Sequence, residues 1–274
     1  MGNVIIVVWR ESLEAMLVVT ILAGALNRMG IASGKRYLWA GVSAGVALSL
    51  VLALGLQQVQ ERLPENAYDI FQAGLLLLAV GLVTHMVIWM QKHGRKMKHE
   101  LESETHAALA RTGLWGIALV AALAIAREGV ETVVFLYGLA LGNHLSASAL
   151  SLGALAGLAL AFGTSVLLSR GMRGFSYRTF FQTTGILLLL FATSMLVTAI
   201  GQFTQLDLLP ALIDPVWNSA WLLDESSAIG GPIAAFTGYR SHPSLIQILA
   251  IVGFWALTLP LMLRTATPAS TRKE

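Results

Sequence analysis

The stretch NVIIVVWRESLEAMLVVTILAGALN, residues 3–27, decides the fold. A helix needs roughly 20 apolar residues to cross a hydrocarbon layer about 30 Å thick. This stretch is long enough, although it carries Arg10, Glu11 and Glu14 inside it. A cleaved signal peptide would have a basic residue ahead of its apolar run, and none is present here. We therefore expect a membrane span with charges inside it.

The composition of the whole chain agrees with that expectation. Of the 274 residues, 56% are hydrophobic and 12% are charged, and the mean hydropathy is +0.71. Soluble domains carry about 25% charged residues, so a soluble enzyme, a nucleic-acid-binding module and a disordered protein are excluded. The absence of cysteine excludes disulfides, cysteine-zinc sites and iron–sulfur clusters. A metal would be held by oxygen or nitrogen, or weakly by methionine sulfur.

Six further segments are long and apolar enough to cross a membrane. The seven predicted spans cover residues 3–27, 38–57, 70–91, 113–139, 147–169, 179–202 and 245–264. The predicted fold class is an all-α integral membrane protein with seven transmembrane helices.

The basic residues are divided unequally between the two sides of the membrane. Fourteen of the 18 Lys and Arg residues fall in the loops after the first, third and fifth spans and in the C-terminal tail, whereas Arg62 and Arg240 lie on the other side. Cytoplasmic loops carry the excess of Lys and Arg in membrane proteins. The N-terminus is therefore predicted to lie outside and the C-terminus in the cytoplasm.

The first three predicted spans resemble the next three. RESLE at 10–14 in the first span corresponds to REGVE at 127–131 in the fourth. Glycine pairs follow in the second and fifth spans, and a Phe-Gln pair opens the third and sixth. Because each unit has an odd number of spans, the second copy is inserted upside down. This 3+3 inverted repeat plus a seventh helix is typical of secondary transporters.

The predicted organisation has five parts. They are a first repeat at 1–91, a cytoplasmic linker helix at 92–112, a second repeat at 113–202, an extracytoplasmic segment at 203–244 with short helices of its own, and a seventh helix with a cytoplasmic tail at 245–274.

The two charged motifs are the candidate site. Glutamates three residues apart share one helix face, and each arginine lies four residues before the second glutamate. Inserting such a charge costs about 2.5–3.5 kcal/mol for Arg or Asp, so six of them indicate a function. If the motifs meet across the repeat axis, four carboxylates and two guanidinium groups carry a formal charge of about −2, which a multivalent cation would balance. Carboxylate oxygens suit Mg²⁺, Ca²⁺, Mn²⁺ and ferric iron.

Arg-Glu-x-x-Glu in the first and fourth of seven spans resembles the oxidase-dependent iron permease family, and the similarity covers nearly the whole chain. Further matches are MVIWM at 86–90 with the basic segment after it, the WLL run at 221–223 and the stretch at 238–244. His85 departs from the pattern, because an aromatic residue is expected there.

The resemblance implies iron import across the plasma membrane, which is the inner membrane in a bacterium, without enzymatic activity. It implies that iron arrives as Fe(III) from an extracytoplasmic oxidase or peroxidase, with an iron-delivery protein as a further partner. Iron is then the transported substrate, and neither a permanent cofactor nor nucleic acid is expected. The family's proposed ligands map onto Glu11, Glu14, Glu128 and Glu131, supported by the charges of Arg10 and Arg127. Asp224 and Glu225 lie in a comparable outer loop and are candidates for iron capture.

Three other interpretations stay open at this stage. The motifs fix ligands and not the cargo, so a transporter of a related divalent metal such as lead or manganese fits them as well. A membrane-embedded di-metal oxidase would use Glu-x-x-His motifs, which neither motif contains. A purely structural Arg–Glu lock between helices is the third.

Overall fold

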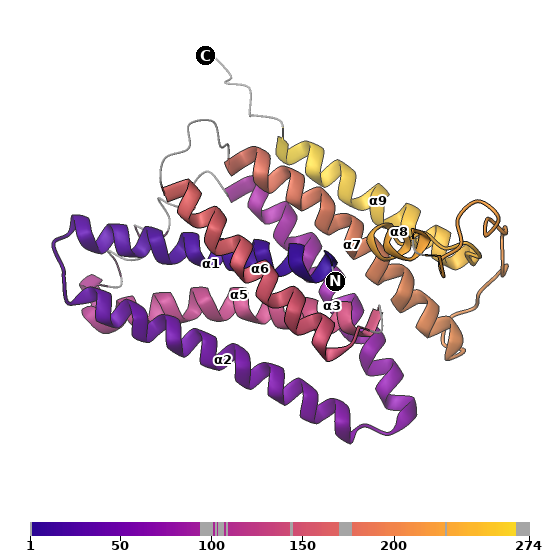
Figure 1. Ribbon diagram of the computed structural model, residues 1–274, viewed down its shortest axis with the longest axis horizontal. Helices are drawn as coiled ribbons and strands as arrows, with labels where there is room; N and C mark the ends of the chain where they lie inside the picture. Colours follow the sequence, from indigo (N-terminus) through magenta and orange to yellow (C-terminus); the bar gives the residue numbers. More distant parts are fainter. Residues whose placement is uncertain are drawn as a thin grey trace, which may run out of the picture. The chain divides into compact units, whose positions relative to one another are not determined.

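The computed structural model describes residues 2–93, 101, 103, 107, 109–142, 145–169, 177–227 and 229–266. In this part of the chain seven long helices and one short helix are defined (Figure 1). Their bounds are α1 Gly2–Arg28, α2 Gly34–Arg62, α3 Glu65–His93, α5 Leu114–Gly142, α6 Ala147–Ser169, α7 Tyr177–Gln205, α8 Gly230–Thr237 and α9 Leu245–Ala266.

Each long helix occupies one of the seven ranges predicted from hydropathy. Several extend beyond the apolar core, as α2 does, because a helix continues through polar residues at its ends. Five described helices contain a window apolar enough to cross a membrane, namely those within α2, α3, α6, α7 and α9. The other two long helices, α1 and α5, are the ones that carry the charged motifs. The chain is an all-helical integral membrane protein.

The first of two compact units consists of α1, α2, α5 and α6. Helix α2 runs along α5, α6 packs on α1, and α1 also contacts α5 (Figure 1). Helices α1 and α5 are antiparallel: Glu11 near the start of α1 lies by Glu131, and Leu26 near its end clusters with Ile117 at the start of α5. The unit therefore combines helices from both halves of the sequence.

Glycines allow the helices of this unit to pack closely at two corresponding places. A Cβ added to Gly45 of α2 would lie 2.8 Å from Ile125 Cβ of α5, and one added to Gly157 of α6 would lie 2.9 Å from Val8 Cβ of α1. Gly45 and Gly157 are 112 residues apart, and Val8 and Ile125 are 117 residues apart. These are the offsets that separate the two halves in the sequence, so the α2–α5 contact repeats in the α6–α1 contact.

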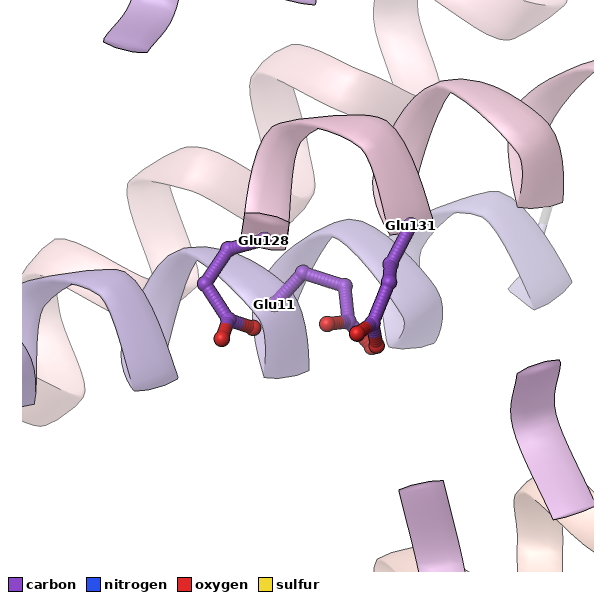
Figure 2. Close-up of side chains that lie close together, drawn as sticks. All are labelled: Glu11, Glu128 and Glu131. Atoms are coloured by element: carbon purple, nitrogen blue, oxygen red, sulfur yellow. The ribbon is translucent and has the colours of Figure 1, made fainter. Parts of the chain in front are cut away.

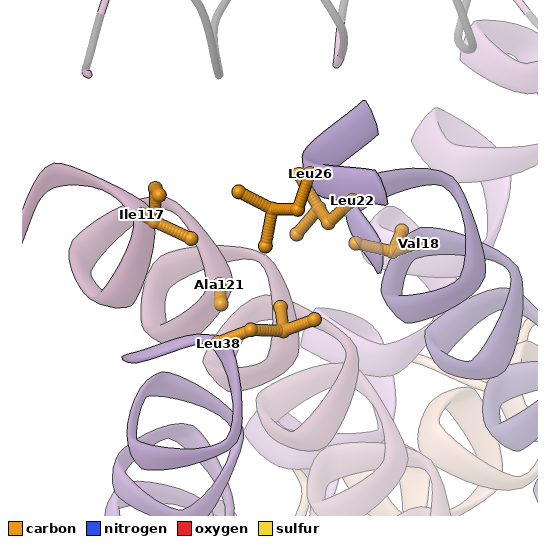
Figure 3. Close-up of a cluster of buried hydrophobic side chains, with 6 residues drawn as sticks. All are labelled: Val18, Leu22, Leu26, Leu38, Ile117 and Ala121. Atoms are coloured by element: carbon orange, nitrogen blue, oxygen red, sulfur yellow. The ribbon is translucent and has the colours of Figure 1, made fainter. Parts of the chain in front are cut away.

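A cluster of apolar side chains lies at one end of the unit (Figure 3). It contains Val18, Leu22 and Leu26 of α1, Leu38 of α2, and Ile117 and Ala121 of α5. Along α1 this apolar cluster begins one turn after Glu14, and along α5 it ends before Arg127. It therefore lies between the charged motifs and the loop that joins α1 to α2.

The second compact unit consists of α3, α7, α8 and α9. Helix α3 packs on α7, and α9 contacts both. The segment between α7 and α9 contains turns and one described short helix, α8, which packs on α7 where Ser194 Oγ donates to the carbonyl oxygen of Ala234 at 3.3 Å. Most of the predicted linker helix at 92–112 lies outside the described residues.

Candidate metal centre

Helices α1 and α5 bring three carboxylates together (Figure 2). Glu11 comes from α1, and Glu128 and Glu131 come from adjacent turns of α5. One oxygen atom of each lies within 4.8 Å of the other two. Oxygen ligands bound 2.0–2.6 Å from a hard cation lie up to roughly 4 to 5 Å apart across it. The three side chains therefore have the spacing of a cation site, and we call them the glutamate cluster.

Each member of the glutamate cluster presents an oxygen atom that has no protein partner. Glu11 Oε2, Glu128 Oε2 and Glu131 Oε2 are buried and accept no hydrogen bond from the part of the chain that the structure describes. An unsatisfied buried polar group costs about 1–3 kcal/mol, and more when it is charged. One such atom on each of three clustered carboxylates indicates a site that a ligand completes.

The charged side chains of the motif in α1 are buried. Arg10 and Glu11 are each 1% exposed. Arg10 Nη1 donates to Glu11 Oε1 at 3.0 Å, and Arg10 Nη2 lies 2.9 Å from Glu14 Oε1. One guanidinium group therefore pairs with two carboxylates of its own helix and offsets one of their two charges. Glu14 is buried by this pair and lies outside the glutamate cluster.

The motif in α5 is more open. Arg127 Nε donates to Glu131 Oε1 at 3.1 Å, the spacing of an i to i+4 pair on a helix. The Arg127 side chain is 43% exposed, whereas that of Glu131 is 9% exposed. The two arginines stand at the same motif position but in different environments.

Sequence reasoning did not identify Ser49 as a neighbour of the site. Ser49 of α2 is buried and donates to the carbonyl oxygen of Gly45 at 2.9 Å. Its side chain packs directly against Gly129, where any Cβ would clash with it. The signal in the sequence is the glycine inside the second motif, because glycine inside a helix often permits a close contact.

The outer-loop carboxylates have local partners. Glu225 Oε1 accepts from the Ser241 backbone N–H at 2.6 Å, and Glu225 Oε2 pairs with Arg240 Nη1 at 3.0 Å. Asp224 Oδ1 accepts from the backbone N–H and the hydroxyl of Ser226, both at 2.8 Å. These bonds lower the pKa of Asp224, with the backbone bond contributing most. His85 is exposed on α3 and is not part of the glutamate cluster.

Comparison with known proteins supplies the family. The chain is 30% identical to an uncharacterized protein of Archaeoglobus fulgidus over the whole of this chain and 98% of that protein. It is 29% identical to the ferrous iron permease EfeU of Escherichia coli O6:H1, covering 89% of this chain and 88% of the relative. It is 27% identical to the ferrous iron permease EfeU of Yersinia pestis, covering 97% and 94%. No solved structure matches the chain.

The family model for the iron permease FTR1 family matches residues 1–266, nearly the whole chain. The resemblance predicted from the charged motifs is thereby confirmed, and so is the expectation of a permease rather than an enzyme. On this evidence the chain belongs to the iron permease FTR1 family.

Proposed function

We propose that this protein imports iron across the plasma membrane, the inner membrane in a bacterium, and binds it at the glutamate cluster on the way. The observation that carries the proposal is the convergence of three carboxylates, those of Glu11, Glu128 and Glu131, each of which has a buried oxygen atom without a hydrogen-bond partner among the described residues. Hard oxygen ligands of this kind suit iron and exclude a preference for Cu(I). The family and the named relatives support iron as the cargo.

Glu14 is the fourth carboxylate of the proposed site. It pairs with Arg10, whose Nη2 lies 2.9 Å from Glu14 Oε1, and it is not among the three carboxylates of the glutamate cluster. A movement of α1 that loosens this pair would bring Glu14 to the cation. Glu14 then serves the site in a step of transport in which its pair with Arg10 is open.

The proposed topology has seven spans, with the N-terminus outside and the C-terminus in the cytoplasm. The repeats are inverted, and transport proceeds as they move around the central site. Two observations support the inversion: α1 and α5 are antiparallel, and the glycine contact of α2 with α5 repeats in α6 with α1. In this topology α1 and α5 are spans whose charges lie inside the bundle, as charged residues within membranes do.

The proposed supply of iron is Fe(III) produced by an extracytoplasmic oxidase or peroxidase, with an iron-delivery protein as a further partner. The two EfeU relatives are named ferrous iron permeases, so the oxidation state of the cargo has to be measured. Asp224 is the better candidate for outer capture, since both oxygens of Glu225 already hold Arg240 and Ser241. Asp224 is exposed and keeps its charge at mildly acid pH because its pKa is lowered.

The experiment is radio-iron uptake by cells that lack their own iron importers. Wild type is compared with Glu131→Gln, at matched amounts in the membrane, with Fe(II) kept reduced and Fe(III) supplied as citrate in separate wells. Glu61→Gln is the control, because Glu61 is exposed near the end of α2 and bonds to Gln57. We expect uptake in wild type and control and none in Glu131→Gln. Competing lead and manganese test the related-metal alternative, and normal uptake by Glu131→Gln would refute the proposed site.

A further inference from the structure

The two arginines of the site differ in how deeply their side chains are buried. Arg10 is 1% exposed and contacts two carboxylates of α1. The Arg127 side chain is 43% exposed, although its partner Glu131 is only 9% exposed. The charge of Arg10 is therefore enclosed within the site, whereas the side chain of Arg127 is partly open to its surroundings.

Arg127 shares a ligand with the cation. Its Nε binds Glu131 Oε1, while Oε2 of the same carboxylate is among the atoms without a protein partner. A cation on Oε2 and the guanidinium group on Oε1 would repel each other across one carboxylate. A charged side chain within a span faces the bundle interior or water. The guanidinium group of Arg127 can therefore move away from Glu131 toward such a polar environment.

The formal charge of the site depends on whether Arg127 contributes its positive charge. With four glutamates and both arginines in place, the site carries −2, which a divalent cation balances. Without the charge of Arg127 it carries −3, which a trivalent cation balances. We propose that Arg127 is the residue that sets the preference of the glutamate cluster for the charge of its cation, favouring divalent ions while it is bound to Glu131. This inference rests on the proposed function, because it requires that the cluster binds the transported metal.

The size of the effect follows from the distance between the charges. One charge within about 4–6 Å of a carboxylate changes its affinity for a proton by roughly one to three powers of ten. The effect on a metal ion grows with each unit of its charge. Removing the charge of Arg127 should therefore shift the ratio of trivalent to divalent affinity by about tenfold or more.

The test uses the purified full-length protein in lipid nanodiscs. Mn²⁺ and Ga³⁺, the latter supplied from a weak chelate, are the probes, since neither changes its oxidation state under these conditions. Bound metal is measured in competition for wild type, Arg127→Gln, Arg127→Met and Arg127→Lys. Arg62→Gln is the control because Arg62 is exposed at the end of α2. We expect both uncharged variants to shift the ratio about tenfold or more toward Ga³⁺, and Arg127→Lys and Arg62→Gln to keep the wild-type ratio.

The outcomes separate this inference from the proposed function. If wild type binds Mn²⁺, Glu131→Gln abolishes that binding, and the uncharged Arg127 variants keep the wild-type ratio, then the role of Arg127 is wrong and the site stands. A shift in Arg127→Lys as large as in Arg127→Gln would also overturn it, because the charge would not be the cause. If wild type binds neither ion, or Glu131→Gln binds normally, the metal site itself fails and this inference fails with it.

Discussion

The motifs RESLE at 10–14 and REGVE at 127–131 have the same charges at the same spacing, yet the structure uses them differently. In α1 the arginine is enclosed and pairs with both glutamates, of which Glu11 belongs to the glutamate cluster and Glu14 does not. In α5 both glutamates belong to the cluster and the arginine is half exposed. Equal sequence motifs thus give unequal sites, because burial depends on the helices that cover each motif.

The two motifs also differ in the residues that lie between their charges. Gly129 in α5 is pressed against Ser49 of α2. The corresponding positions, at the same offsets, are Ser12 in α1 and Ala161 in α6. One helix pair has glycine facing serine, and the other has serine at the position of glycine and alanine at the position of serine. The two helix pairs therefore differ by one methyl group at these positions.

The largest expected effect distinguishes the glutamates of α1. Glu11→Gln should reduce Mn²⁺ affinity by about a hundredfold or more, because a ligand charge within the cluster is lost. Glu14→Gln should reduce it by less than about tenfold, since Glu14 is held by Arg10 and is not in the cluster. Equilibrium metal binding to the purified variants measures both. Equal losses would mean that the two α1 glutamates are equivalent in the metal-bound state.

The arginines should differ in stability as they do in burial. Arg10→Ala leaves Glu11 and Glu14 buried without their counter-charge, and breaking such a buried pair costs about 3–5 kcal/mol. Arg127→Ala should cost less than this, because the Arg127 side chain is 43% exposed and pairs with one buried carboxylate, that of Glu131, where Arg10 pairs with two. Thermal unfolding in detergent, followed by circular dichroism, compares the two. A similar loss in both variants would show that Arg127 is as enclosed as Arg10.

The glycine contacts provide a matched test of the repeat. Gly45→Ala and Gly157→Ala should each destabilise the protein by about 1–3 kcal/mol, because the added methyl group overpacks an interhelical contact. Gly55→Ala in α2 and Gly163→Ala in α6 should be close to neutral, since nothing lies within 4 Å of a Cβ there. The same unfolding assay applies. A neutral result at one of the first two positions alone would break the correspondence between the halves.

The smallest effect is expected in the outer loop. Asp224→Asn should reduce uptake only at limiting iron, whereas Glu225→Gln should loosen the loop through Arg240 and Ser241. The pKa of Asp224 is lowered, so its charge is complete above its ordinary pKa and is lost only as the pH falls through the lowered value. Initial uptake by wild type relative to Asp224→Asn should therefore not change between pH 5 and pH 7 on account of this group. A ratio that collapses at pH 5 would contradict the assignment.

The positions of the long helices could be predicted because the length of an apolar run nearly determines a membrane span. Residues 147–169 were predicted as a span and form α6 with the same bounds. The meeting of the two motifs could also be expected from their repetition. The different burial of Arg10 and Arg127 could not, because it depends on which helix covers each motif. Nor could the partners of Glu225, which come from residues 15 and 16 positions later in a loop.

The apolar cluster at the end of the first unit affects where an ion released from the glutamate cluster can go. An ion that leaves the glutamates toward the loop between α1 and α2 meets Val18, Leu22 and Leu26 of α1 and Ile117 of α5, which offer it no polar ligand. A hydrophobic constriction can stop ions by excluding water, even where the side chains do not close the path sterically. If the glutamate cluster binds the transported ion as proposed, the apolar cluster offers a released ion no ligand in this direction while α1 and α5 keep their contact.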